Sequence, residues 1–363
     1  MSRSLSRALM AAALAAPAAP AMAAPAVIAS IPPVHALVAG VMEGVAEPRL
    51  LVEGGQSPHT YSLAPSEAAA LEEADLVVWV GPVLESFLER PVASIAREEA
   101  VLRLIRLDGL DVLANREGGT WEGHAHEHGH DEAHGDDHAA EDGHDEAEGH
   151  GDEAHGEAGG GHGDDHAAEG GHDEHSAAEG GHDAHAMDER RIDPHVWLDP
   201  DNARAIVAAL AERLAALDPA NAEAYRANAE ALDARITETD AAIAERLAPV
   251  ADVPYIVFHD AYHYFERRYD LAAVGSVTIS PDRRPGARRL SEIREKIEDL
   301  GAACVFREPQ FAPDLVETVV EDTDADVGSL DPLGAGLEPG PDLYPRLMTA
   351  LADNLVDCLG PES

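Results

Sequence analysis

The sequence predicts an α/β protein with two lobes, because short apolar strands alternate with amphipathic helices twice along the chain. The first alternation precedes a histidine-rich tract, and the second follows residue 250. Apolar, β-branched segments such as 75–81 are typical of strands that are buried on both faces of a parallel sheet. Roughly 300 residues lie outside the tract, which favours about two domains. We therefore expect two mainly parallel sheets, joined by one long helix.

The first lobe is expected over residues 24–200. Pro32 and Pro33 open its first helix, since proline fits the first helical turn, and Ser66 begins the second. Its strands are predicted at 26–30, 49–53, 75–81 and 101–106, and its helices at 33–46, 66–74 and 83–97.

A helical segment, 201–249, follows the first lobe. Pro219 interrupts it, and the second of its two helices would be ~40 Å long at ~1.5 Å per residue. That length suffices to run from one lobe to the other; the alternative is an amphipathic helix on the surface of one lobe. The second lobe is expected over residues 250–363. Its strands are predicted within 254–260, 271–279, 303–311 and 326–331, and its helices at 262–269, 287–301, 312–325 and 341–359.

Fifteen of the 20 histidines lie between Trp121 and Ala186, among Asp, Glu, Gly and Ala. With almost no larger apolar side chain, this tract cannot bury enough surface to offset its conformational entropy, so we expect a disordered loop over 121–188. Imidazole is the commonest metal ligand, so the loop is expected to bind metal weakly; the alternatives are an engineered tag and a solvated spacer. Six accessory ligands are assigned to its first part: His124, His126, His128, His130, His134 and His138.

The formal net charge is −45, about half of it from the tract. This charge suits cations and argues against nucleic acid, whose phosphates are bound by Lys and Arg. Residues 1–23 read as a secretory signal peptide, in which Arg3 and Arg7 precede an alanine-rich apolar stretch and Ala21 and Ala23 mark a cleavage site. The sequence after the signal peptide contains no apolar run of ~20 residues, so no further membrane span is expected. The mature protein is therefore expected in the periplasm.

Four residues outside the tract stand where an α/β protein would collect ligands. His59 follows a strand through a Gly-Gly loop, His259 ends a strand, and Asp331 follows a short strand. His195 lies in DPHVWLD, just after the tract. Ligands of open α/β sheets bind outside the carboxyl ends of the strands. Three imidazoles with one carboxylate or water make a four-coordinate zinc site, whereas each histidine alone would be read as structural.

Zinc fits these ligands best, since imidazole-rich sites suit Zn, Cu and Ni while carboxylate-rich sites suit Mn, Mg and Ca. His259 and His263 also have the i, i+4 spacing of the HExxH metalloprotease motif. A protease is disfavoured, because Asp260 replaces the Glu that acts as general base and because His259 ends a strand. His263 is expected to be an exposed helix residue, and His35 to be structural.

Cys304 and Cys358 are the only cysteines. In an exported protein an even number suggests a disulfide, which would close a loop of ~54 residues and could contribute roughly 4 kcal/mol. Two buried free thiols are the alternative. A zinc site is disfavoured, because neither cysteine belongs to a CxxC pair.

Several motifs, spread in order over essentially the whole mature chain, resemble the zinc-binding periplasmic proteins of ABC uptake transporters, the ZnuA type. They are GGQSPHTYSLAPSE, GPVLESF, DPHVWLDP, FHDAYHYF, VFREPQF and LDPLG. The resemblance implies two α/β lobes joined by one rigid helix, with the metal in the cleft between them. It also implies a His/Asp/Glu-rich loop at the place of the tract.

Carried over to this chain, the resemblance implies that His59, His195 and His259 are the zinc ligands, with Asp331 or water as the fourth. Manganese-type relatives have a carboxylate at the position of His259, which favours Zn(II). Some members have a Glu just before the first histidine, and Pro58 stands there instead. The resemblance further implies that Cys304 and Cys358 form a disulfide. It also implies that Glu308 supports the cleft without binding metal.

The function expected from these observations is high-affinity capture of Zn(II) and delivery to an ABC permease of the inner membrane. The protein is expected to be a monomer and no enzyme, with a periplasmic metallochaperone as a further candidate partner. Two alternatives stay open at this point. One is a zinc hydrolase, since three histidines and an open position also suit catalysis. The other is a zinc buffer in which the tract is the functional part.

Overall fold

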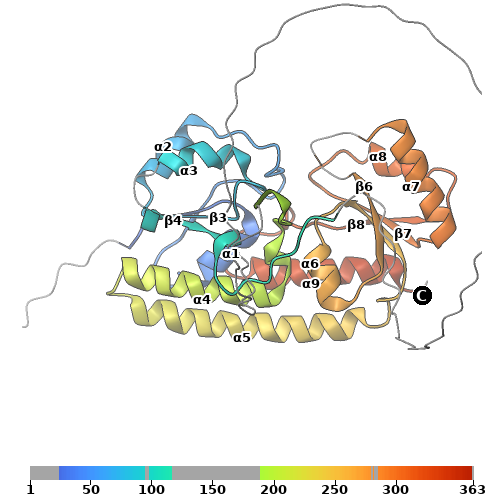
Figure 1. Cartoon of the computed structure of the whole chain (residues 1–363). Coiled ribbons are helices and arrows are strands. Elements are labelled where there is room, and N and C mark those ends of the chain that lie inside the picture. Colours follow the sequence, from blue (N-terminus) through green and yellow to red (C-terminus); the bar gives the residue numbers. More distant parts are fainter. Residues whose placement is uncertain (1–23, 95–97, 117–188, 279–280, 282–284, 362–363) are drawn as a thin grey trace, which may run out of the picture. The chain divides into compact units, whose positions relative to one another are not determined.

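The computed structural model describes residues 24–94, 98–116, 189–278, 281 and 285–361 (Figure 1). The signal peptide predicted over 1–23 and the loop predicted over 121–188 lie outside these residues, and so do the six accessory histidines of the loop. Among the described residues, none of the helices combines the length and apolar character that a membrane crossing requires.

The first sheet has four parallel strands in the order β2-β1-β3-β4. Each strand is short, and β1 and β3 at the centre are buried along their whole length, as expected of a sheet covered on both faces. The strands are β1 (Val27–Ala29), β2 (Arg49–Leu50), β3 (Leu76–Trp79) and β4 (Val101–Arg103). The helices are α1 (Pro32–Val41), α2 (Pro65–Glu73) and α3 (Glu89–Ser94), with short 3-10 turns η1 (Ser86–Leu88), η2 (Glu98–Ala100) and η3 (Leu104–Arg106).

The second sheet repeats this architecture, with parallel strands in the order β6-β5-β7-β8. Its central strand β5 is fully buried. The strands are β5 (Tyr255–His259), β6 (Ala273–Thr278), β7 (Cys304–Arg307) and β8 (Asp326–Ser329). The helices are α6 (His263–Tyr269), α7 (Ala287–Leu300), α8 (Asp314–Val320) and α9 (Leu343–Leu359).

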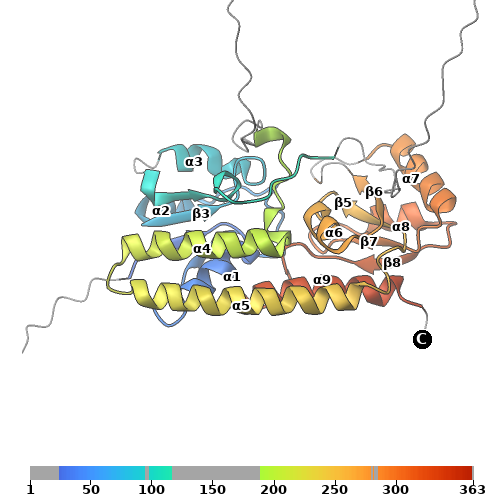
Figure 2. The same cartoon turned by 60° about the horizontal axis from the view of Figure 1, so that its bottom comes forward.

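Two long helices lie between the sheets in sequence: α4 (Pro200–Leu217) and α5 (Ala222–Leu247), preceded by the turns η5 (Glu189–Arg191) and η6 (Val196–Leu198). Helix α5 runs alongside α4 and α9 beneath both sheets (Figure 2). It contacts α1 of the first lobe, where a Cβ on Gly40 would lie 2.7 Å from Leu232 Cδ2. It also contacts α9, through the ion pair of Arg246 with Asp353 at 2.6 Å. The prediction of a long helix that joins two parallel-sheet lobes is thus confirmed. The lobe boundaries 24–200 and 250–363, with the helical segment 201–249, stay a prediction.

Cys304 and Cys358 form a disulfide, with their Cα atoms 6.3 Å apart. It ties the start of β7 to the end of α9, so it anchors the last helix to the sheet that carries His259. The expected pairing is present, and the alternative of two free thiols is wrong.

Two predicted helices are shorter than expected. The helix predicted over 83–97 becomes the turn η1 followed by α3, because the buried Glu85 carboxylate accepts hydrogen bonds from Gly81 N (2.9 Å) and Val80 N (3.2 Å) and so fixes a turn there. The helix predicted over 312–325 is only α8, since Glu321 leaves the helical conformation with a ψ of 127° and Asp322 follows with a left-handed φ of 67°.

Candidate metal centre

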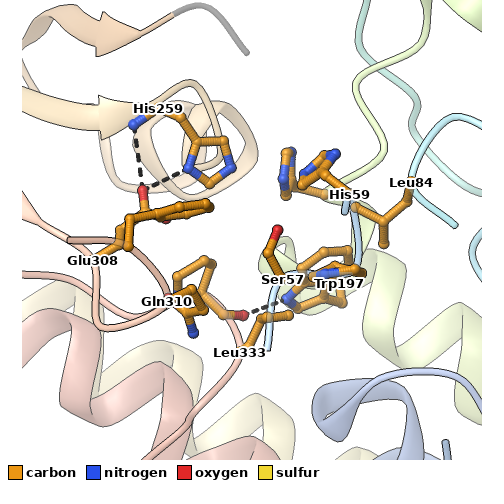
Figure 3. A pocket seen from close by; sticks show the side chains of 12 residues that line it. Ser57, His59, Leu84, Trp197, His259, Glu308, Gln310 and Leu333 are labelled. Atoms are coloured by element: carbon orange, nitrogen blue, oxygen red, sulfur yellow. Dashed lines mark hydrogen bonds and ion pairs between the residues drawn. The ribbon is translucent and has the colours of Figure 1, made fainter. Parts of the chain in front are cut away.

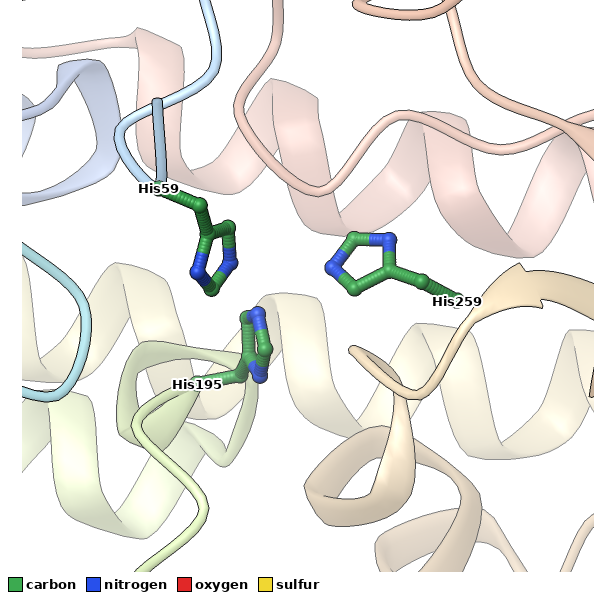
Figure 4. Close-up of side chains that lie close together, drawn as sticks. All are labelled: His59, His195 and His259. Atoms are coloured by element: carbon green, nitrogen blue, oxygen red, sulfur yellow. The ribbon is translucent and has the colours of Figure 1, made fainter. Parts of the chain in front are cut away.

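Three segments that are far apart in sequence bring His59, His195 and His259 together (Figure 4). His59 lies in the loop after β2, His195 directly precedes η6, and His259 ends β5. One ring nitrogen of each lies within 4.8 Å of the others. The ring centroids of His195 and His259 are 5.3 Å apart, and His59 lies 5.8 and 5.7 Å from them. Among the described residues, this is the group of at least three His, Cys, Asp or Glu side chains that has the spacing of a metal site.

His195 is oriented by Asp193, two residues before it. One carboxylate oxygen of Asp193 accepts the backbone N–H of His195 at 3.0 Å and lies 2.7 Å from its Nδ1. Because a carboxylate only accepts hydrogen bonds, Nδ1 carries the hydrogen and Nε2 keeps its lone pair. Burial, together with the neighbouring His259, lowers the pKa of His195 well below its ordinary value. The ring is therefore held neutral, which is the form that binds metal.

His259 is oriented in the same way by a carboxylate from a different segment. Oε1 of Glu308 lies 2.6 Å from His259 Nδ1 and also accepts the backbone N–H of His259 at 3.3 Å (Figure 3). The Nε2 atom of His259 is buried, with no hydrogen-bond partner among the described residues. Burial lowers the pKa of His259, but the charge and hydrogen bond of Glu308 outweigh it, so the net shift is upward. A buried, unpartnered imidazole nitrogen costs free energy unless a ligand occupies it.

His59 is half-buried and lies in a loop that contains Gly54 and Gly55. At Gly54 a Cβ would lie 2.8 Å from Ala335 Cα, so only glycine lets this loop approach the loop that follows β8. Gln310 strengthens the contact, because its Nε2 donates to Gly54 O at 3.0 Å.

Asp331, the fourth predicted ligand, does not belong to the group of three histidines. Its carboxylate is engaged by other donors. It accepts the backbone N–H groups of Leu333 (3.0 Å), Gly334 (3.0 Å) and Ala335, and the Nε2 of Gln310 at 2.8 Å. The structure thus brings together three of the four predicted ligands, and it uses Asp331 to hold the 331–335 loop.

The remaining two histidines outside the tract lie apart from this group. His35 is buried in α1 with its Nε2 3.0 Å from Pro48 O, which fits the structural role expected of it. His263 begins α6 and is half-buried, with Nδ1 3.8 Å from Asp193. The expectation of an exposed His263 is therefore wrong, because α6 turns its first residue toward Asp193.

The pocket around the three histidines is small and largely apolar (Figure 3). Leu84, Trp197, Phe311 and Leu333 line it beside the imidazoles. Its cavity volume of about 10 Å³ is roughly the space that one water-sized sphere fills. The pocket therefore suits a single ion or water rather than an organic molecule.

Asp193 is a functional residue that was not predicted from the sequence. The signal was present, since metal-bound histidines almost always donate their second nitrogen to a carboxylate, carbonyl or water, and Asp193 stands two residues before His195. Glu308, implied to support the cleft, does so through its contact with His259. Burial raises the pKa of Asp193, and the hydrogen bond from His195 opposes this shift and favours the carboxylate form.

The fold has two parallel-sheet lobes on shared helices. Three histidines converge, and carboxylates orient two of them. Together these features define a two-lobed protein with a candidate metal centre. The chain belongs to the family described as zinc-uptake complex component A, periplasmic, whose model matches residues 27–358.

Similar proteins cover nearly the whole chain. A high-affinity zinc uptake system protein ZnuA from Brucella abortus (strain 2308) is 44% identical over 333 residues, covering 92% of this chain and 91% of that protein. The protein of the same name from Paracoccus denitrificans (strain Pd 1222) is 39% identical over 337 residues, covering 93% and 92%. A crystal structure of ZnuA superimposes with a TM-score of 0.65 at 21% identity, covering 93% of this chain and all of that one. The last comparison supports the fold.

Proposed function

We propose that this protein captures Zn(II) with ring nitrogens of His59, His195 and His259 and delivers it to an ABC permease of the inner membrane. The observation that carries the proposal is the convergence of the three rings, with Nδ1 of two of them held by carboxylates. This arrangement leaves nitrogen lone pairs directed at one point in a pocket of about one ion's size. The names of the relatives, zinc uptake system proteins, agree with it.

Zinc is the proposed cargo because a set of three imidazoles suits Zn, Cu and Ni and gives no carboxylate of the kind that Mn, Mg and Ca prefer. We propose water as the fourth ligand, with Asp331 as the alternative. For Asp331 to bind the metal, its carboxylate would have to give up hydrogen bonds from the 331–335 backbone or from Gln310.

The proposed site of action is the periplasm, reached after cleavage of the leader near Ala23. The disulfide between Cys304 and Cys358 supports an oxidising compartment. The proposal keeps the loop 121–188 as a low-affinity collector of zinc, a monomeric state, and a periplasmic metallochaperone as a further partner.

A zinc hydrolase is the main alternative, and the site offers little support for it. The carboxylates nearest to the histidines, Asp193 and Glu308, are engaged by the imidazoles that they orient. The pocket has space for about one water-sized sphere, which suits an ion or a water better than an organic substrate.

Calorimetric zinc titration of His59→Ala, His195→Ala and His259→Ala tests the proposal. Each variant is expected to lose the tight site, because the metal then has two imidazole ligands instead of three. His35→Ala is the matched control, because His35 lies in α1 apart from the three histidines, and it should keep tight binding. Tight zinc binding that persists in all three site variants would refute the assignment.

Deletion of 121–188 separates a carrier from a buffer. A carrier keeps one tight zinc and loses only weak sites, whereas a buffer loses nearly all of its zinc capacity.

A further inference from the structure

The two described segments on either side of residues 117–188 pair with each other. We call this pair, residues 113–116 and 190–193, the neck. Ala114 and Ile192 form an antiparallel bridge. Two backbone hydrogen bonds flank the bridge: Asn115 N to Arg191 O and Asp193 N to Leu113 O, both 2.8 Å. The neck therefore holds two parts of the chain in register directly before the ligand His195.

The neck is bound to helix α6 of the second lobe. The hydroxyl of Tyr264 accepts the backbone N–H of Leu113 at 3.0 Å and donates to Asp193 O at 2.9 Å. One buried tyrosine thus contacts both segments of the neck and ties them to the lobe that carries His259.

Arg116, at the end of the neck's first segment, makes the strongest of these contacts. Its guanidinium forms a fork on Asp260, with Nε 3.0 and 3.1 Å from the two carboxylate oxygens and Nη2 in closer contact. The same Nη2 lies 2.7 Å from Oε2 of Glu266 in α6. All three side chains are largely buried, with exposed fractions of 16, 15 and 4%. Arg116 therefore fixes the turn that follows His259 and joins β5 to α6.

These contacts form a continuous path between two metal ligands of different lobes. His195 is held by Asp193, Asp193 belongs to the neck, and Arg116 of the neck holds Asp260, the residue after His259. The rings of His195 and His259 have the shortest separation of the three pairs, 5.3 Å. We propose, building on the proposed function, that Arg116 is a positioning residue that sets the spacing of His195 and His259 and so controls zinc affinity.

The charge of Arg116 and its positioning act on zinc in opposite directions. Without the positive charge of Arg116 the site would attract a dication more strongly, so loss of the charge alone would strengthen zinc binding. Loss of positioning would let His259 and His195 drift apart and weaken binding, as happens when outer partners of metal ligands are removed, typically by 10–100-fold. The direction of the change in affinity therefore distinguishes the two effects.

Arg116→Met, compared with wild type by zinc titration against a competing chelator, tests the inference. We expect about 10-fold weaker binding, mainly as faster zinc release, and an altered visible absorption spectrum of the Co(II)-substituted protein. Arg116→Lys should give a smaller loss, because the lysine ammonium can still contact one carboxylate although it cannot form the fork. Arg226→Met is the matched control, since Arg226 forms an exposed pair with Glu212 between α4 and α5; it should bind zinc as wild type does.

Unchanged or tighter zinc binding by folded Arg116→Met would overturn the inference. If that variant fails to fold, because an uncompensated buried carboxylate is costly, Arg116→Lys decides the question by the same titration, since it keeps the charge and any weaker binding then reports lost positioning. Wild type without a tight zinc site would instead refute the proposed function, so the two failures are distinguishable.

Discussion

Asp193 and His195 form a two-residue unit in which one carboxylate oxygen contacts both the backbone N–H and the Nδ1 of the same histidine, at 3.0 and 2.7 Å. The residue between them is Pro194, whose ring restricts the backbone. This local unit fixes which nitrogen faces the pocket through contacts that span only three residues of the sequence.

Asp193→Asn should weaken zinc binding by roughly 10–100-fold, because the amide no longer accepts from Nδ1 as a charged group and His195 becomes a poorer ligand. Zinc titration with a competing chelator measures the change. Asp233→Asn, which removes an exposed partner of Arg204, is the control and should have wild-type affinity. Equal affinities for both variants would contradict the role assigned to Asp193.

Gly54→Ala should also weaken zinc binding, since its new Cβ would meet the backbone of Ala335 at 2.8 Å and displace the loop that carries His59. The neighbouring Gly55→Ala is a control of matched size, because nothing lies within 4 Å of a Cβ there. We expect the affinity to fall at least several-fold for the first variant only. Calorimetry of both proteins at one pH makes the comparison, and a loss in both would point to backbone flexibility rather than contact.

The double variant Cys304→Ala/Cys358→Ala should have a free energy of unfolding about 4 kcal/mol lower than wild type, because the disulfide closes a loop with a separation of 54 residues. Urea unfolding measures this difference. A reducing agent should destabilise wild type and leave the double variant unchanged. Zinc affinity of the folded double variant should stay within a few-fold of wild type, because neither sulfur lies in the pocket lining.

Glu85 should make the protein less stable as the pH rises. Burial raises the pKa of this carboxyl from 4.5 to about 7, against the hydrogen bonds from Gly81, Ser30 and Val80 that lower it. A raised folded-state pKa gives stability that is fully present below about pH 4.5 and is lost as the pH rises through about 7. The difference amounts to about 3 kcal/mol at ~1.4 kcal/mol per pH unit.

Glu85→Gln removes this titration, so its stability should change less than that of wild type between pH 4.5 and 7.5. Urea unfolding of both proteins across that range is the measurement. Parallel stability curves would show that Glu85 does not titrate there.

Much of the fold was predictable from the sequence, because strands such as 75–81 are continuous apolar runs and helices such as α5 carry apolar residues at helical spacing. The three histidines were also predictable, since each stands near the carboxyl end of a strand or in a distinct motif, and parallel sheets bring such ends to one edge. Their convergence follows from topology more than from local sequence.

The residues around the ligands were harder to predict. Arg116 meets Asp260 across 144 positions of sequence, and Glu308 meets His259 across 49. No local pattern marks such pairs. Asp331 is difficult for another reason, because a carboxylate after a strand can either bind a metal or accept hydrogen bonds from backbone N–H groups of the next turn. Only the three-dimensional arrangement shows that Asp331 accepts the backbone hydrogen bonds.

The Ala114–Ile192 bridge has a consequence for the length of the chain between its two partners. Because the bridge sets the distance between the ends, extra residues inserted between them leave the geometry at His195 unchanged. Loop-closure entropy rises only slowly with length, by about 0.6 kcal/mol for each doubling. A protein built in this way can gain or lose whole blocks of histidine and carboxylate residues at little thermodynamic cost, and so adapt the weak metal binding that we propose for this segment independently of the proposed tight site.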